Sequence, residues 1–357
     1  MDAFRKPKYA GIKKYLLENI ENGHFKTYDK LPSENELVRQ FNISHITARK
    51  AMSDLASEGR VYRVQGKGSF VSPPQQDELE IDVFHHMEID KGNKIPSQDS
   101  SYINIFRGIG EYTTNKNIRL RTVFLEPGPD SENKHLEKLI EDKSQGALLF
   151  LTNPEINVAG LKKLHEADIP YVLLDRSTHS YICNFTASNN LAGGYMQTAH
   201  LTQLGHRRIV YITTKNNINT EKERYMGYRE AMADICPEIE ARNLCYDNDF
   251  EDKIKQLINK QDISALAVVN DVTALYILQQ LEKIGVSVPG DLSLIGFDDW
   301  EPSRFVKPAL TTIKQDFMLM GRQAAQLLHE AMKDNTIKGK SVQLPVSLVV
   351  RDSTAVI

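Results

Sequence analysis

Six apolar runs of strand length recur in the last three quarters of the chain, and helix-length segments separate them. The runs are rich in Val, Ile and Leu, as strands covered on both faces are. Strands alternating with helix-length segments indicate βαβ units and parallel sheets. We therefore predict an α/β body. The predicted strands are residues 119–125, 146–151, 171–174, 208–213, 265–269 and 292–297.

Residues 1–72 differ from the rest of the chain in charge. They hold 13 Lys and Arg against 8 Asp and Glu, whereas the remainder holds 31 against 39. A basic segment on an acidic one favours a polyanion-binding head on a body that nucleic acid does not attract. The prolines and polar residues of 73–78 predict an extended linker. We predict a head at 1–72, a linker at 73–78 and a body at 79–357.

Several classes of protein are excluded by what the sequence lacks. No apolar run approaches the ~20 residues of a membrane span, and the charged N-terminus is unlike an export signal, so we expect a cytoplasmic protein with no membrane partner. Three cysteines without CxxC spacing indicate neither a disulfide framework nor a zinc site. No nucleophile elbow or dinucleotide motif occurs, and a phosphate loop would need Gly at Val61 and Ser or Thr at Gly68. We predict no enzyme activity, no catalytic residues, no metal and no cofactor.

The head has the spacing of a helix-turn-helix. An apolar stripe predicts a first helix over residues 9–22. Ser33 and Glu36 can form a capping box, which would start a second helix. Ser44 is the predicted N-cap of a third helix that ends at Gly59.

The third helix turns polar and basic residues away from its buried stripe. Arg and Lys can donate to guanine edges or phosphates, Thr can serve either, and an outward Ile suits a thymine methyl group. For a helix taken alone, a solvated basic face is the alternative interpretation. The outward residues are His45, Ile46, Thr47, Arg49 and Lys50.

A short hairpin is predicted directly after the third helix. Residues 61–64 and 69–71 are typical of two strands joined by a tight basic tip. Such a hairpin is a wing, and it favours DNA over the solvated face. Its glycines let the backbone approach DNA, and Lys67 or Gln65 can enter a minor groove or bind phosphate. The tip residues are Gln65, Gly66, Lys67 and Gly68.

Residues 8–72 resemble the DNA-binding domain of the GntR family. The matching segments are 31–37, 44–51, 55–59 and 66–71. One departure is His45, where the family commonly has arginine. The DNA contacts that the resemblance implies are Ser33, Glu34, Ser44, Thr47, Arg49 and the wing glycines.

Residues 79–357 resemble the effector domain of the LacI/GalR family, which shares its fold with periplasmic sugar-binding proteins. Matching segments include 169–176, 204–209, 288–299 and 310–315. The resemblance implies a periplasmic-binding-protein-like body of two subdomains that binds a small molecule and forms a homodimer. A GntR head on such a body resembles the arabinose-responsive repressors of the AraR type.

Polar residues directly follow several predicted strands of the body. Ligands of α/β sheets bind beyond the carboxyl ends of the strands. Sugar hydroxyls both donate and accept, so carboxylates, amides and guanidinium groups in a dry cleft suit them. Each residue alone could instead be a strand-end cap or a surface ion pair. By resemblance to sugar-binding relatives, the predicted effector-binding residues are Asp175, Arg176, Arg224, Asn270, Asp298 and Gln315.

Two histidines follow a predicted strand at residues 81–84. His85 and His86 stand where the family's first strand reaches the cleft, but paired histidines without further ligands are more often solvent-facing than metal-bound. Their role stays open, as does the pocket wall over residues 87–106.

Together these features predict a sequence-specific DNA-binding regulator. We expect a repressor that a monosaccharide such as a pentose releases from its double-stranded operator. The alternatives are a regulator with a non-sugar effector and a transport-associated sugar-binding protein, although the latter would require an export signal and no basic head.

Overall fold

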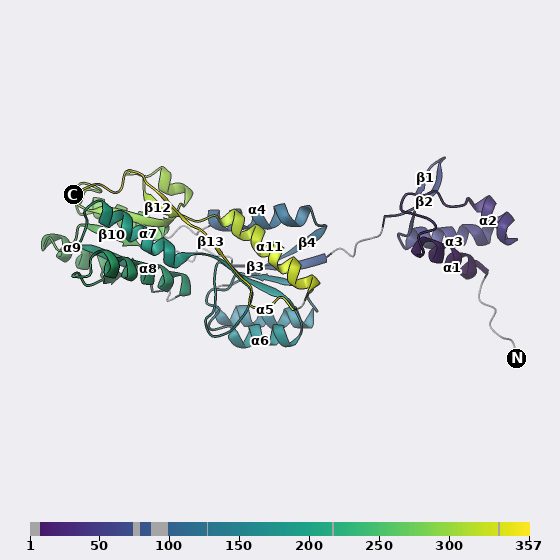
Figure 1. Cartoon of the computed structure of the whole chain (residues 1–357), viewed down its shortest axis with the longest axis horizontal. Helices are drawn as coiled ribbons and strands as arrows, with labels where there is room; N and C mark the ends of the chain where they lie inside the picture. The colour runs from purple at the N-terminus through teal and green to yellow at the C-terminus, as the bar shows by residue number, and fades with distance from the viewer. Residues whose placement is uncertain (1–7, 74–78, 87–98, 127, 216–217, 335) are drawn as a thin grey trace. The chain divides into compact units, whose positions relative to one another are not determined.

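A computed structural model describes residues 8–73, 79–86, 99–126, 128–215, 218–334 and 336–357. The chain divides into two compact units, residues 1–78 and 79–357 (Figure 1). Apart from Pro73, the predicted linker lies outside the described residues. Among the described residues, no helix is both long enough and apolar enough to cross a membrane.

The head is a winged helix-turn-helix, as predicted. Its core is formed by apolar residues of all three helices and both strands, including Leu16, Leu37 and Leu55. The predicted capping box and the Ser44 N-cap are both confirmed. Its elements are α1 (Lys8–Glu21), α2 (Glu34–Phe41), α3 (His45–Ser57), β1 (Val61–Val64) and β2 (Gly68–Val71).

The body contains two sheets, which confirms the predicted α/β class. The first sheet, in the order β13-β7-β6-β5-β3-β4, is parallel throughout. Helices α4 and α11 contribute to the core on one face, and α5 and α6 to the core on the other. We call this part lobe 1. Its elements are β3 (Leu79–His86), α4 (Asp99–Thr114), β4 (Ile118–Leu125), α5 (Pro129–Glu141), β5 (Ala147–Leu149), α6 (Val158–Glu166), β6 (Tyr171–Leu174), β7 (Phe185–Ser188), α11 (Phe317–Lys333) and β13 (Ser341–Leu344).

The second sheet has the order β14-β12-β11-β10-β8-β9, and only the edge strand β14 is antiparallel to its neighbour. Helices α7 and α8 pack on one face, and α9 and α10 on the other. We call this part lobe 2. Its elements are α7 (Asn190–Gln203), β8 (Ile209–Thr213), α8 (Asn219–Ile235), β9 (Arg242–Cys245), α9 (Phe250–Asn259), β10 (Ala265–Val268), α10 (Asp271–Lys283), β11 (Ser293–Asp298), the 3₁₀ helix η1 (Glu301–Arg304), β12 (Thr311–Lys314) and β14 (Ser347–Val349).

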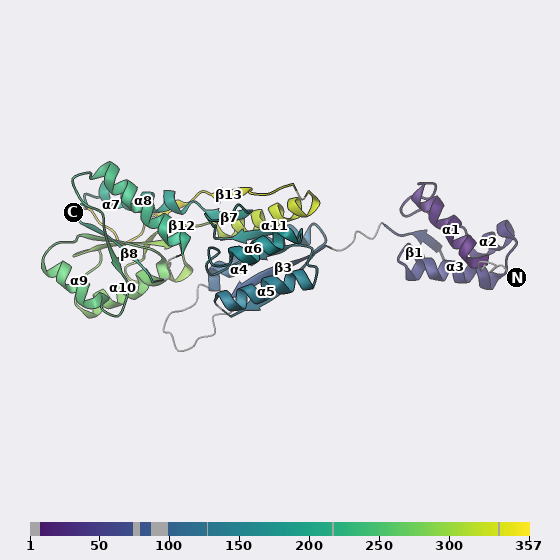
Figure 2. The ribbon, with the colours of Figure 1, turned by 90° about the horizontal axis from the view of Figure 1, so that it is seen from below.

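In the described part of the chain, the backbone passes between the lobes three times, after β7, after β12 and after β13. The C-terminal segment α11–β13 therefore returns to lobe 1, where β13 lies beside β7 (Figure 2). The first and third crossings touch, because Asn189 N donates to Leu344 O at 2.8 Å. Gln315 lies in the second crossing. The crossings thus place predicted site residues at the junction of the lobes.

The first strand of lobe 1 is longer than the sequence indicated. β3 continues to His86, because residues 85 and 86 pair in register with Phe124 and Leu125 of β4. The expectation that the histidines are solvent-facing is wrong for His86, which is buried. Of residues 87–106, whose part in the pocket wall the sequence left open, residues 87–98 lie outside the described residues.

Candidate functional site

The outward face of α3 carries exposed side chains that were predicted to contact DNA. Ile46 is 82 % exposed, so its apolar side chain is accessible on this face. His45, Arg49 and Lys50 are exposed around it, while Thr47 is half-buried. The residues predicted from helix periodicity therefore share one accessible face.

Two of the predicted contacts on this face also have structural roles. Ser33 Oγ accepts from Glu36 N at 3.2 Å, and Glu36 Oε2 accepts from Ser33 N at 2.7 Å. Ser44 Oγ accepts from Thr47 N at 3.2 Å. A serine that caps a helix holds its hydroxyl at the positive N-terminal end, where a phosphate is also favoured.

The basic residues of α3 are held by acidic neighbours. Arg49 Nε donates to Glu34 Oε2 at 3.2 Å, and Lys50 Nζ lies 3.5 Å from Asp54 Oδ1. Glu34 also lies 3.8 Å from Arg63 Nη2 on β1. Arg63 was not among the predicted contacts, although its side chain is exposed on β1.

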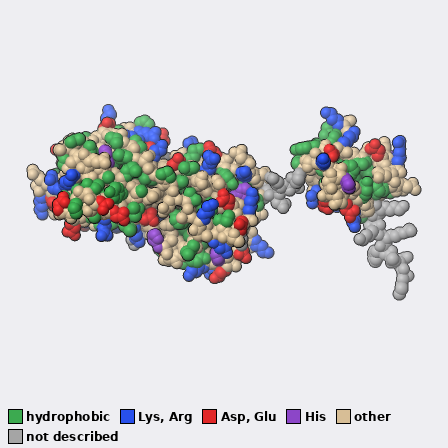
Figure 3. All heavy atoms as spheres, in the orientation of Figure 1, with side chains coloured by type: hydrophobic (Ala, Val, Ile, Leu, Met, Phe, Trp, Pro, Cys, Tyr) green, Lys and Arg blue, Asp and Glu red, His purple; other side chains and the backbone are tan. Residues whose placement is uncertain are grey.

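The wing is a two-stranded antiparallel hairpin, and two glycines at its tip have positive φ. Val64 pairs with Gly68, and Gly66 and Gly68 have φ of 75° and 119°, which favour glycine. Lys and Arg side chains gather over this hairpin (Figure 3). Lys30 packs beneath it, because a Cβ on Gly68 would meet its Cε at 2.9 Å. The tip therefore presents an exposed backbone and positive charge.

In the body, Asp175 and Arg176 follow β6 at the carboxyl edge of lobe 1. Burial raises the pKa of Asp175, and the Arg176 and Arg224 charges oppose that shift. Arg176 Nη1 donates to Thr152 O at 2.6 Å, and its guanidinium lies 5.2 Å from the Phe150 ring centroid. Within the described residues, Asp175 Oδ1 and Arg176 Nε are buried without a hydrogen-bond partner.

Arg224 of α8 is the centre of the polar cluster in lobe 2. Its Nε donates to Asn190 Oδ1 at 2.9 Å, its Nη1 donates to Val269 O at 2.7 Å, and its guanidinium lies 3.8 Å over the Phe297 ring. Nη1 is also 3.4 Å from Asp298 Oδ1, and both side chains are only 7 % exposed. Arg224 is thus fixed from several sides before any ligand arrives.

Asp298 joins this cluster from the end of β11, and Gln315 from the crossing after β12. Gln315 Nε2 donates to Asp298 Oδ1 at 2.6 Å, and among the described residues Gln315 Oε1 is buried without a partner. Burial raises the pKa of Asp298 to about 6, against the opposing Arg224 charge, and the Asp175 charge raises it further. The carboxyls of the two lobes therefore lie within electrostatic reach of one another.

Asn270 is the predicted residue with the clearest structural role. It is the N-cap of α10, and its Oδ1 accepts from Thr273 N at 2.8 Å. Its neighbour Asp271 was not among the predicted site residues, and it is fully buried. The Asp271 carboxyl accepts hydrogen bonds from Thr312 Oγ1 at 2.6 Å, Ser303 Oγ at 2.8 Å and Trp300 N at 2.9 Å. Burial raises the pKa of Asp271 to about 8. Asp271 thus anchors the loop that follows Asp298.

A buried contact between His86 and Glu132 was not predicted, and neither was a contact between the lobes. His86 Nε2 lies 3.0 Å from Glu132 Oε1, and Thr152 N donates to the same oxygen at 2.6 Å. Between the lobes, Asn219 Nδ2 donates to Glu155 Oε1 at 3.1 Å and to Ser177 O at 3.0 Å. Burial alone would raise the pKa of Glu155, but hydrogen bonds, including those from His179 N and Asn219, lower it to about 2. Only the carboxyl-end position of these residues could have indicated them.

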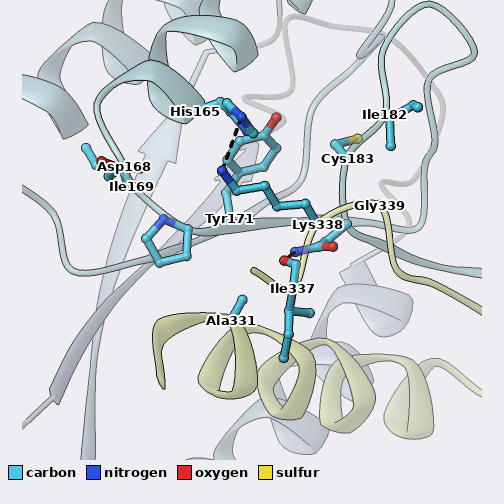
Figure 4. Close-up of a pocket in the computed structure, with 12 residues that line it drawn as sticks. His165, Asp168, Ile169, Tyr171, Ile182, Cys183, Ala331, Ile337, Lys338 and Gly339 are labelled. Carbon is cyan, nitrogen blue, oxygen red and sulfur yellow. Dashed lines mark hydrogen bonds between the residues drawn. The ribbon is translucent and has the colours of Figure 1, made fainter. Parts of the chain in front are cut away.

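A small pocket lies away from these residues, in lobe 1 (Figure 4). It is lined by His165, Tyr171, Cys183 and Lys338 among others, and Lys338 Nζ lies 3.3 Å from His165 Nε2. Its volume of about 30 Å³ holds no more than a few water molecules. It is too small for a monosaccharide.

Two segments of the chain match models of known protein families. Residues 8–71 match the model for bacterial regulatory proteins of the gntR family, and residues 198–354 match the model for a periplasmic binding protein-like domain. The arabinose metabolism transcriptional repressor of Geobacillus stearothermophilus is 29 % identical over 98 % of both chains.

Two solved structures show the same fold as the body. A LacI family transcriptional regulator from Enterococcus faecium with bound ribose has a TM-score of 0.63 and 21 % identity, over 78 % of this chain and 99 % of that one. The lac repressor dimer bound to operator and an anti-inducer has a TM-score of 0.65 and 23 % identity, over 79 % and 96 %.

Proposed function

Because the chain joins a gntR-family DNA-binding domain to a periplasmic-binding-protein-like domain, we propose that it is a sugar-responsive transcriptional repressor. The head binds operator DNA, and a monosaccharide in the body releases it. The observation that carries this proposal is the presence of both recognition surfaces in one chain, an exposed basic face on α3 and the wing, and a buried polar cluster at the junction of the lobes. The relatives it resembles along nearly its whole length are repressors and not enzymes.

A pentose similar to L-arabinose is the proposed effector. The curated relatives that match 98 % of this chain are named for arabinose metabolism. The buried cluster suits a sugar because it offers unpartnered acceptors at Asp175 Oδ1 and Gln315 Oε1 and an unpartnered donor at Arg176 Nε. A hydroxyl group both donates and accepts, so it can pair with either kind of atom. Asp175 and Arg176 would bind from lobe 1, and Arg224, Asp298 and Gln315 from lobe 2, with Asn270 beside them.

The proposed DNA contacts are the exposed residues of α3 and the wing, together with the two helix-capping serines. Ser33 and Ser44 would bind phosphate at helix N-termini, Arg49 and Ile46 would read base edges, and Lys67 and the tip glycines would contact the backbone. A regulator of this kind acts in the cytoplasm, where the DNA is.

A homodimer formed through the body is the proposed active state, since a two-fold protein matches a pseudo-palindromic operator. The edge strand β4 supports an interface in lobe 1, because its Phe124 is 57 % exposed and Ile103 of α4 is 52 % exposed. Sedimentation velocity of the full chain would test this state.

Thermodynamic reciprocity tests the function as a whole. The operator is first selected from a random duplex pool with the wild-type chain, and L-arabinose, D-xylose, D-ribose and D-glucose are each titrated with and without that operator. The effective sugar is expected to weaken operator binding by the same factor by which operator weakens sugar binding. Arg49→Ala is the control at an operator concentration that saturates the wild-type chain but not this variant, where added operator should change the sugar affinity of the variant less than that of the wild-type chain. Equal sugar affinities of the wild-type chain with and without operator would exclude the proposed coupling.

A further inference from the structure

A carboxylate lies on the face of the head that carries its exposed basic residues. Glu34 opens α2, and its two oxygens face two different arginines, Arg49 of α3 and Arg63 of the wing. No other described acidic residue of the head pairs with residues of both α3 and the wing. Glu34 therefore connects the two DNA-facing elements.

Stability does not account for this arrangement. All three side chains are partly exposed, and exposed ion pairs contribute little to folding. A negative charge at this place also repels DNA phosphates, which weakens non-specific binding. Glu34 weakens non-specific binding to DNA and also restrains two arginines, and these are the properties of a residue that determines sequence specificity.

The atom through which Arg49 pairs with Glu34 decides which of its donors stay available for DNA. Arg49 donates to Glu34 through Nε, at 3.2 Å, and this leaves its two terminal amino groups directed elsewhere. The same two groups form the bidentate fork that recognises O6 and N7 of guanine. A guanidinium held at Nε keeps its plane and its reach, so less conformational freedom is lost when it meets a base.

Direct base recognition by Glu34 is the competing interpretation, since a carboxylate can accept from the amino group of cytosine. Both oxygens of Glu34 are already directed at arginines, Oε2 at Arg49 and Oε1 at 3.8 Å from Arg63 Nη2. A base would have to displace at least one of them.

We propose that Glu34 is a positioning residue that sets sequence specificity by orienting Arg49 and Arg63 together, and that Arg63 is a DNA contact of the wing. Without Glu34, the two arginines would be free to bind phosphates of any sequence. This inference rests on the proposed operator binding and adds to it the residue that separates specific from non-specific DNA.

The test compares Glu34→Ala and Glu34→Gln with wild type in the full chain, on the selected operator and on a scrambled duplex, over a range of salt. The ratio of operator to scrambled affinity is expected to fall about tenfold or more, because base contacts lose their geometry. On scrambled DNA, binding should become tighter and its salt dependence steeper by about one to two in the log–log slope, because one or two freed arginines reach phosphates. Arg63→Ala should reduce the slope on operator by about one.

Glu18→Gln is the matched control. It removes the same charge from the head, but Glu18 lies on α1 and pairs with Lys14, 3.6 Å away. It should change neither the ratio nor the slope. Because Ser33 and Glu36 of the capping box are retained, the Glu34 variants should keep the wild-type melting curve of the head, and circular dichroism checks this.

A cycle with the arginines separates positioning from direct contact. In an Arg49→Ala, Arg63→Ala background, Glu34→Ala should have no further effect on the ratio. The same loss in that background as in wild type would show that Glu34 binds the base itself, and an unchanged ratio in the single variant would show that it has no role in specificity. Either result contradicts the inference about Glu34 but not the proposed function. If the wild-type chain selects no sequence from the duplex pool, both the inference and the proposed function are contradicted.

Discussion

The residues proposed to contact DNA and those proposed to contact the effector differ in how much the stability of the protein depends on them. Arg49 is 71 % exposed and pairs with one carboxylate, whereas Arg224 is 7 % exposed and contacts Asn190, Val269, Phe297 and Asp298. Groups in water can be removed with little loss of stability, but a buried charge needs its partner. Recognition and stability should therefore be separable in the head and inseparable in the body.

The largest expected effect is on the stability of the body. Asp298→Ala leaves Arg224 buried without its carboxylate, which should lower the free energy of unfolding by about 3–5 kcal/mol. Sugar affinity should fall as well, because Gln315 loses its partner. Urea unfolding followed by fluorescence, with calorimetric titration of the sugar, measures both.

Glu282→Ala is the control for this variant, since Glu282 is an exposed carboxylate on α10 and its loss should change stability by no more than about 0.5 kcal/mol. An Asp298→Ala protein as stable as wild type would show that recognition and stability are separable in the body as well as in the head, which contradicts the comparison.

A second prediction concerns the pH dependence of the body. The pKa of Asp271 is raised from 3.8 to about 8, chiefly by burial, so between these values the folded state binds a proton that the unfolded chain has lost. Stability should therefore fall as pH rises from about 4 to about 8. Asp271→Asn cannot titrate and should have a shallower slope in this window. Unfolding at a series of pH values measures it, with the wild-type chain as the reference.

Arg49→Ala should have a smaller effect, confined to the head. Losing a base or phosphate contact should weaken operator binding by about 1–3 kcal/mol. The thermal unfolding of both units and the sugar affinity should stay as in wild type. Operator titration at fixed salt checks the first, and calorimetry the second. Unchanged operator affinity would remove Arg49 from the DNA interface.

The smallest expected effect is at Ser33. This residue is an exception within the head, because its hydroxyl is expected to serve both stability and DNA binding. Because its hydroxyl caps α2, Ser33→Ala should lower the stability of the head by about 1 kcal/mol. Ser33→Asp keeps the cap but adds a negative charge, so it should restore stability while weakening operator binding. Ser33→Asn keeps the cap without the charge and is the matched control. If Ser33→Asp binds operator like wild type, this serine is a cap and no phosphate contact.

The elements with local signals could be predicted from the sequence. Ser33, Glu36 and Ser44 stand at fixed short spacings, and the structure uses them as the caps they were expected to be. Strands β7 and β13 were not predicted, since they pair with each other across more than 150 residues of chain. Pairing of that range leaves no pattern in a local window.

For the site, the sequence indicated residue types at strand ends but not which of them meet. The side chains of Arg224 and Asp298 come from different elements, and only the folded sheet brings them to 3.4 Å. Asp271 was missed because its burial depends on Thr312 and the loop at Trp300 and Ser303. Arg63 was missed because its partner lies on another element.

The three crossings between the lobes determine the order in which the parts of the chain can fold during synthesis on the ribosome. The head closes its core within residues 12–71, whereas lobe 1 is complete only after β13 at 341–344 has joined β7. At ~5–20 residues per second, synthesis of the intervening chain takes roughly 15 to 55 seconds. Under the proposed function, the DNA-binding surface would therefore emerge well before the sugar-binding body, and each nascent chain would have an interval in which it could bind operator but not sugar.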